Sequence, residues 1–519
     1  MTGLFGKFAT VGGATMASRI IGFLREALIA AALGTGPVAD VFYVCLRFPN
    51  LFRRLFAEGA FNIAFVPLFA KELEAGGEEA ARQFARQVFA VLSSWLIVLT
   101  VLAIAFMPWL VAHVIAPGFV DTPDKYDLSV TMTRIMFPYL MCMSLVAMFS
   151  GILNSMRRYF LAAIVPVLLN VILVSILLFG IWAGLSDVQV GILLAWGVFV
   201  SGFAQLALLV WGVWSAGLGF ALALPRMTAP VKRLLVLMGP GLLTGGVLQI
   251  NLLIGTIIAT AQDGANALLN FADRLNQLPL GVIGIAVGVV LLPELSRALK
   301  AGDHNQAERL QNRSLEFALA LSLPAAVGFI VMPDEIIRLV YERGAFDAVA
   351  TQQTSLALVA FASGLPAYVL MKVFQPAFFA REDMRTPFWF SLIMVVTNVV
   401  LSLLLFPIYG HVGIAIATSM SAWVNLVLLV VTQWRRGDFK PDGATLQRVQ
   451  FLILASVLMG VVIIGLRWVL EPVLESGFVG QLVAVPMLIL VGAGVHFAVA
   501  FTTGALDRSL LTRLLRRRG

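Results

Sequence analysis

Charge, cysteine and histidine are scarce in this chain. Only 12% of its 519 residues are Asp, Glu, Lys or Arg, and it has two cysteines and four histidines. Two cysteines in apolar segments cannot build a disulfide framework or a cysteine-rich metal site. The histidines are widely scattered, at His113, His304, His411 and His496. We therefore expect no cofactor, no resident metal and no histidine-based catalytic centre.

Apolar residues dominate the composition. They make up 60% of the chain, and the mean hydropathy is +0.94. A soluble core cannot bury that much apolar surface, and long apolar stretches exclude a barrel of short alternating strands. The fold class predicted is an all-α, polytopic membrane protein. Arg19 and Arg25 in the first apolar segment, with no small-residue cleavage signal after it, favour a retained first helix over a signal peptide.

Hydropathy and turn residues predict fourteen spans. They lie at about 8–33, 37–70, 83–112, 127–153, 160–183, 187–215, 231–260, 266–299, 310–332, 349–379, 386–409, 412–434, 447–470 and 478–505. Lys and Arg gather in alternate loops, while the other loops are acidic around Asp121 and Asp334 and contain few cations such as Lys125. This asymmetry places both termini in the cytoplasm. It also explains a pI near 9.8 without a nucleic-acid partner.

The chain contains an internal repeat. Gly118 and Gly344 lie in similar contexts 226 residues apart, and after a two-residue slip Asn170 and Asn398 are 228 apart. Six spans in each repeat predict two lobes related by a pseudo-two-fold axis along the membrane normal. The predicted domains are an N-terminal lobe at 1–220, a C-terminal lobe at 221–440, and an accessory helix pair with a basic tail at 441–519.

Polar side chains occur inside the apolar segments at helical spacing. In the second span Asp40, Arg47 and Arg54 are seven residues apart, and Glu58 follows four residues later. These positions fall near one face of a helix. Pro49 lies within that stripe and predicts a kink there.

Two further spans add polar residues. In the first, Arg19 and Glu26 are seven residues apart and nearly aligned, so we expect an ion pair between them, with Arg25 about a third of a turn away. The eighth span contributes Asn270, Asp273, Arg274 and Gln277.

Arginines outnumber acids in these segments. The arginines are Arg19, Arg25, Arg47, Arg53, Arg54 and Arg274, and the acids are Glu26, Asp40, Glu58 and Asp273. An intramembrane Arg costs about 2.5–3.5 kcal/mol and usually marks a site. We expect the acids to form structural ion pairs. The excess guanidinium suits a multivalent anion such as phosphate or diphosphate. Catalytic carboxylate pairs, a Ser/His/Asp set and a phosphate-binding loop are missing, which favours a transport cavity over an enzyme.

The stretch at residues 49–61, Pro-Asn-Leu-Phe-Arg-Arg-Leu-Phe-Ala-Glu-Gly-Ala-Phe, resembles the signature of MurJ/MviN-type lipid II flippases. This family belongs to the multidrug/oligosaccharidyl-lipid/polysaccharide exporter superfamily. Supporting stretches are 18–26, 39–42, 116–119 and 272–275, and the likeness covers essentially all fourteen spans. It implies two six-helix lobes around a cationic cavity, and a final helix pair forming a hydrophobic groove.

The resemblance also implies a substrate and the residues that bind it. The substrate is the undecaprenyl-diphosphate-linked disaccharide-pentapeptide precursor of peptidoglycan, moved from the inner to the outer leaflet. The residues that match the family's essential ones are Arg19, Arg25, Arg53 and Arg274, with Asp40 as an important acid. Around them we place Arg47, Arg54, Glu58, Glu26, Asn270 and Asp273 as supporting cavity residues. Ala267 and Gln277 stand where family members have a serine and a glutamate, so those contacts are not carried over. Spans 7 and 11 offer Asn251 and Asn398 but no carboxylate for sodium.

The function predicted is therefore lipid II flipping by alternating access, driven by membrane potential, in the bacterial inner membrane. We expect a monomer that contacts lipid II and membrane lipids, with cell-wall synthesis proteins as further candidate partners. A flippase for another polyprenyl-diphosphate-linked glycan has the same electrostatics, and only the motif disfavours it. A cation-coupled multidrug exporter is a less favoured function, because a site for organic cations needs acidic and aromatic residues. A membrane enzyme on lipid-linked sugars would need acidic catalytic residues in its loops.

Overall fold

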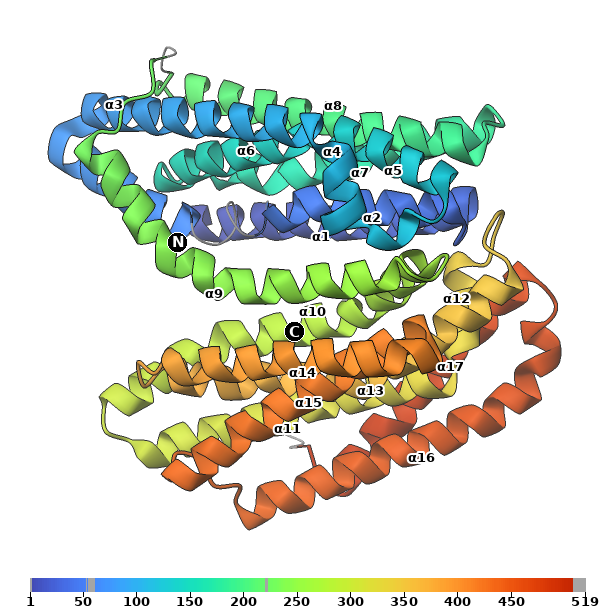
Figure 1. The fold of residues 1–519 in the computed structure, drawn as a ribbon. Coiled ribbons are helices and arrows are strands. Elements are labelled where there is room, and N and C mark those ends of the chain that lie inside the picture. The colour runs from blue at the N-terminus through green and yellow to red at the C-terminus, as the bar shows by residue number, and fades with distance from the viewer. Residues whose placement is uncertain (1, 53, 55–60, 220–222, 507–519) are drawn as a thin grey trace. The chain divides into compact units, whose positions relative to one another are not determined.

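The computed structural model describes residues 2–52, 54, 61–219 and 223–506. Its regular elements are helices, and no strand occurs in these ranges. The chain divides into two compact units (Figure 1). Unit 1 contains residues 1–267 and the short segment 343–346; unit 2 contains 268–342 and 347–519.

Unit 1 is built from helices drawn in blue to green in Figure 1. They are α1 (Thr2–Leu33), α2 (Pro37–Phe52), α3 (Phe61–Ala105), α4 (Met107–Leu110), η2 (Val111–Ile115), η3 (Pro117–Phe119), α5 (Pro123–Met136), α6 (Pro138–Ser155), α7 (Tyr159–Trp182), α8 (Asp187–Ser215) and α9 (Ala229–Ala259).

Unit 2 holds the remaining helices. They are α10 (Ala265–Lys300), whose first three residues belong to unit 1, α11 (His304–Val331), α12 (Pro333–Tyr341), α13 (Ala348–Phe379), α14 (Arg385–Tyr409), α15 (His411–Arg436), α16 (Gly443–Leu474) and α17 (Phe478–Thr502). The last two form the predicted accessory pair. Large apolar side chains on them are exposed, such as Trp468 at 78% and Leu490 at 72%. A lipid-facing surface has this character.

The all-helical, membrane-spanning fold class is confirmed. Ten helices among the described residues are long and apolar enough to cross a membrane. Most helices begin and end within a few residues of the predicted spans, and α8 has the predicted bounds of 187–215. The count of fourteen spans and the rotation axis between lobes stay predictions. So do the domain boundaries at 220 and 440, because the two units reflect packing and not the repeat.

The region of the second and third spans differs from the prediction. We expected one kinked span over 37–70, a loop, and a third span from 83. In the structure α2 runs to Phe52, and residues 53 and 55–60 lie outside the described ranges. The helix α3 then runs from Phe61 through the expected loop to Ala105, with a break at Gly77 (φ 70°). A positive φ suits glycine, which has no Cβ to clash. The sequence from Lys71 to Arg82 is rich in Glu and Ala, which are good helix formers, so its charge did not make it a loop.

Equivalent helices pack in the same way in both units. In unit 1, α7 packs on α8, α8 on α6, and α6 on α3; in unit 2, α14 packs on α15, α15 on α13, and α13 on α11. Asn170 and Asn398, related by the offset of 228, are both buried, at 7% and 4% exposure. These pairings agree with the internal repeat.

A loop between α13 and α14 is fastened to the end of α15. Arg436 donates a 2.8 Å hydrogen bond to Asp383 Oδ2, and the Thr386 hydroxyl and backbone N–H also donate to the same carboxylate. Burial by itself would raise the pKa of Asp383, but these hydrogen bonds lower it to about 2. The loop is therefore held by an ionised carboxylate over the ordinary pH range.

Candidate functional site

The predicted substrate ligand Arg25 lies in a hydrogen-bonded cluster that joins three helices of unit 1. Its Nη1 donates to Asn170 Oδ1 on α7 at 2.9 Å, and its Nη2 forms an ion pair with Glu26. Tyr43 on α2 donates to the other Glu26 oxygen at 2.7 Å, and Asn170 donates to the Ser18 carbonyl at 3.1 Å. Arg25 retains only 12% side-chain exposure. The cluster therefore fixes α1 against α2 and α7 and orients the guanidinium.

Glu26 was expected to neutralise Arg19, and that pairing is wrong. The ion pair runs to Arg25, because the side chain of the adjacent residue reaches round the helix to the same carboxylate. Arg19 is exposed and has no ion pair among the described residues. Of the two arginines of α1, Arg19 is thus the one without an ion pair in the part of the chain that the structure describes.

The predicted residues near the end of α2 fall into two groups. Arg47 is half-buried and donates from Nη1 to Thr256 Oγ1 of α9 at 2.6 Å. Arg54 is exposed and has no ion pair among the residues that the structure describes. Arg53 and Glu58 lie outside the described residues.

Asp40 is the most enclosed of the predicted site residues that the structure describes. Its side chain is 0% exposed, and Oδ2 accepts a 2.7 Å hydrogen bond from Lys125 Nζ of α5. Oδ1 accepts from the backbone N–H groups of Asn266 and Ala267, at 2.8 and 3.3 Å. These donors belong to the first turn of α10, where N–H groups lack helical partners and a negative charge is favoured. Asp40 therefore holds the start of α10 against α2.

Lys125 was missed as a site residue. From the sequence it was one of few cations in the acidic loops, yet its side chain is only 3% exposed. Besides Asp40 it contacts Asp263 Oδ1 at 2.9 Å, and Nζ lies 4.1 Å from the centre of the Phe119 ring. The available signal was spacing: Ser129 and Thr133 follow Lys125 at four-residue intervals, marking a polar face on α5.

Two close backbone contacts lie at helix ends of unit 1. Gly344 has a φ of +59°, and a Cβ placed on it would lie 2.2 Å from the Ala31 carbonyl oxygen of α1. The neighbouring Ala345 N–H donates to that oxygen at 2.9 Å. Gly118, which the repeat pairs with Gly344, would likewise meet the Thr260 carbonyl after α9 at 2.5 Å. Only glycine permits so close an approach.

In unit 2 the predicted residues lie on one face of α10. Asp273 accepts a hydrogen bond from Gln277 and interacts electrostatically with Tyr368 of α13. Arg274 is half-buried and has no ion pair among the described residues; Asn270 is half-buried too. Sequence reasoning also missed Lys372 on α13, an exposed cation within a candidate span.

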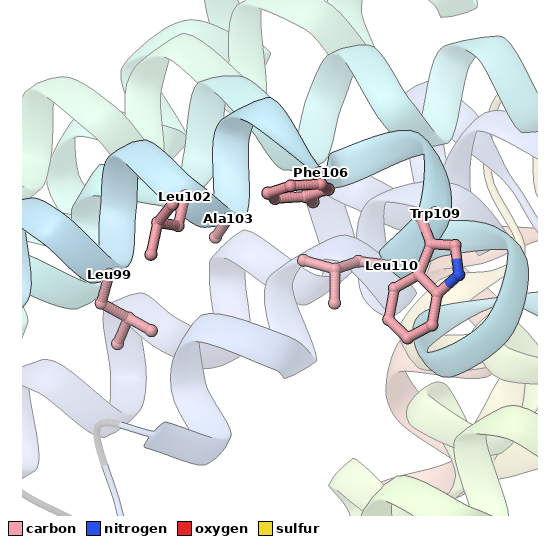
Figure 2. A pocket seen from close by; sticks show the side chains of 6 residues that line it. All are labelled: Leu99, Leu102, Ala103, Phe106, Trp109 and Leu110. Atoms are coloured by element: carbon pink, nitrogen blue, oxygen red, sulfur yellow. The ribbon is translucent and has the colours of Figure 1, made fainter.

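Two cavities lined by described residues are largely apolar. One, of about 500 Å³, lies where α3 meets α4 and is lined by Leu99, Leu102, Ala103, Phe106, Trp109 and Leu110 (Figure 2). Another, of about 350 Å³, lies in unit 2 between α11, α12, α16 and α17, with Phe329, Met459 and Ile489 in its wall. No group of three His, Cys, Asp or Glu side chains suited to a metal occurs in the described ranges.

Comparison with known proteins decides the family. The model of the family described as lipid II flippase MurJ matches residues 29–485, most of the chain. The chain belongs to the lipid II flippase MurJ family. This confirms the family resemblance of residues 49–61 and places the chain among transporters.

Relatives in this family align over nearly the whole chain. A probable lipid II flippase MurJ of Rhizobium tropici is 51% identical over 99% of this chain and 96% of its own length. The lipid II flippase MurJ of Burkholderia cenocepacia is 34% identical over 88% and 89%. A solved lipid II flippase MurJ in an inward closed conformation matches with a TM-score of 0.75 over 94% of this chain and 98% of that one. At 24% identity this last match shows the fold alone.

Proposed function

We propose that this protein is a lipid II flippase, which moves the undecaprenyl-diphosphate-linked peptidoglycan precursor from the inner to the outer leaflet of the bacterial inner membrane. Family membership supports the substrate class. The observation that carries the proposal is the unequal pairing of charge. Arg19 and Arg274 have no ion pair among the described residues, whereas Asp40 and Glu26 are bonded to cations of the protein itself.

This imbalance leaves guanidinium groups for a ligand. Exposed arginines within a membrane protein are costly unless they face water or an anion. Arginine's planar fork suits the oxygens of a diphosphate, which it binds with two hydrogen bonds at once. We assign diphosphate binding to Arg19, Arg25, Arg53 and Arg274. Arg25 is already oriented by Asn170 and Glu26, which lowers the ordering cost of binding.

Asp40 takes a different part in this proposal. Both of its oxygens are hydrogen-bonded, to Lys125 and to the first turn of α10, so it acts by holding α10 and not by contacting the anion. Alternating access requires such contacts at helix ends to form in one state and separate in the other. The surroundings of the binding arginines are formed by Arg47, Arg54, Glu58, Glu26, Asn270 and Asp273.

Membrane potential supplies a driving force. Moving negative charge out of a negative-inside cell is favourable by about 2.3 kcal/mol per charge per 100 mV. A diphosphate of roughly two charges would gain about twice that. We further propose that the transporter is a monomer. We also propose that both of its termini lie in the cytoplasm, as the distribution of Lys and Arg in its loops predicts. The pocket between α11 and α16 would hold part of the polyprenyl chain.

A growth test separates this function from its rivals. Arg19→Ala and Arg274→Ala should each fail to support a flippase-depleted bacterial strain while the protein still reaches the membrane. Arg435→Ala, which removes an exposed arginine at the end of α15, is the matched control and should support growth. Normal growth with Arg19→Ala or Arg274→Ala would refute the assignment. A multidrug exporter would not support growth of the depleted strain even as the unaltered protein.

A further inference from the structure

Lys372 is an exposed cation within an otherwise buried part of α13. Its neighbours Met371 and Val373 are 9% and 0% exposed, and α13 is a candidate membrane span. The aliphatic stem of Lys372 lies against α10, because a Cβ placed on Gly284 would be 3.7 Å from Lys372 Cγ. The side chain thus extends along the junction of α10 and α13, with its stem on apolar surface and its charge accessible.

Polar side chains of α10 and α13 lie near Lys372. It has no ion pair among the described residues. One turn away, Tyr368 donates a hydrogen bond to the Thr418 carbonyl and lies within electrostatic reach of Asp273 of α10, so a polar strip of side chains, with Arg274 next to Asp273 in sequence, lies near Lys372. A lysine directed at lipid at this position would cost about 2.5–3.5 kcal/mol. A lysine beside a polar strip avoids that cost by remaining in water or by binding an anion.

Distance along α10 separates Lys372 from Arg274. Gly284, which Lys372 contacts, is ten residues beyond Arg274, or roughly 15 Å at 1.5 Å per residue. That separation of the two backbones leaves room for a second anionic group beside a diphosphate. If Arg274 holds the diphosphate, Lys372 lies where a second anionic group of the same substrate would reach it. Lysine, a compact charge on a flexible stem, suits a single carboxylate better than a bidentate diphosphate.

We propose that Lys372 binds a carboxylate of the peptide part of the lipid-linked substrate, while Arg274 binds its diphosphate. This rests on the proposed function. It makes Lys372 a specificity residue, which distinguishes a precursor that carries a peptide from polyprenyl diphosphates that carry neutral sugars or none.

Binding of two purified ligands to the detergent-solubilised protein tests the proposal. Lys372→Gln should raise the Kd for lipid II about fivefold, and leave the Kd for undecaprenyl diphosphate, which has no peptide, unchanged. Arg274→Gln should raise both. Lys372→Arg should restore binding of lipid II. The matched control is Lys300→Gln, which removes an exposed cation at the far end of the same α10 and should change neither.

The outcomes distinguish the inference about Lys372 from the proposed function on which it rests. An equal loss of affinity for both ligands in Lys372→Gln would make Lys372 a diphosphate contact and overturn the inference. An unchanged Kd for lipid II would also overturn it. Failure of the unaltered protein to bind lipid II would overturn the proposed function, and the inference with it. Equal melting temperatures of the variants exclude a folding defect as the cause.

Discussion

Replacing Lys125 by leucine removes the cation that faces the buried carboxylate of Asp40. Both side chains are nearly inaccessible, at 3% and 0% exposure, so water cannot replace the lost partner. Removing one member of a buried ion pair costs about 3–5 kcal/mol. At roughly 2 °C per kcal/mol for a compact unit of this kind, the melting temperature should fall by roughly 6–10 °C.

Two related variants set the scale. Asp40→Asn keeps an oxygen for the N–H groups of Asn266 and Ala267 and leaves Lys125 paired with Asp263, so it should cost about 1–3 kcal/mol. Asp263 is 86% exposed, and Asp263→Asn should cost less than about 1 kcal/mol. The predicted order of melting temperatures is therefore Asp263→Asn, then Asp40→Asn, then Lys125→Leu as the lowest.

The double variant gives the sharpest test. Lys125→Leu combined with Asp40→Asn removes both buried charges, so it should melt higher than Lys125→Leu alone. Tryptophan fluorescence of the detergent-solubilised protein, heated in steps, measures all four variants. The reasoning fails if Lys125→Leu has the same melting temperature as the unaltered protein. It also fails if the double variant melts at a lower temperature than Lys125→Leu.

Two further predictions concern the backbone at Gly344 and the loop that contains Asp383. Gly344→Ala should lower the melting temperature much more than Gly302→Ala does. Both glycines have a positive φ, but only a Cβ on Gly344 would meet a backbone oxygen, that of Ala31 at 2.2 Å. Equal decreases would show that the strain of a positive φ is the whole effect. Because Asp383 has a pKa lowered from 3.8 to about 2, the loop that Arg436 holds should be stable above pH 3.8 and loosen as pH falls towards 2. Proteolysis of that loop across this range measures it, and Asp383→Asn should abolish the dependence.

The positions of the helices could largely be predicted from the sequence. Apolar runs and turn residues are local signals, and they placed α8 and most later helices within a few residues. The region after α2 was harder, because a charged run that looks like a loop also contains good helix formers. There the helix continues to Gly77, and hydropathy alone could not show it.

The partners of the charged residues could be predicted less well. Asp40 and Lys125 are 85 residues apart in sequence, and Arg25 and Asn170 are 145 apart. Helical spacing tells which side chains share a face, but not which helix lies opposite. That is why Glu26 was assigned to Arg19, why Lys125 was taken for a loop cation, and why Lys372 was missed. The candidate arginines themselves were identified, because charge within apolar segments is a local signal.

Translocation of lipid II in liposomes tests the central claim most directly. The purified protein should move lipid II across the bilayer, faster with a membrane potential that is negative on the side of origin. Arg274→Gln should stop this transport while the protein stays folded, and Arg435→Gln should not. Transport that is equally fast with Arg274→Gln, or no transport of lipid II by the unaltered protein, would contradict the account.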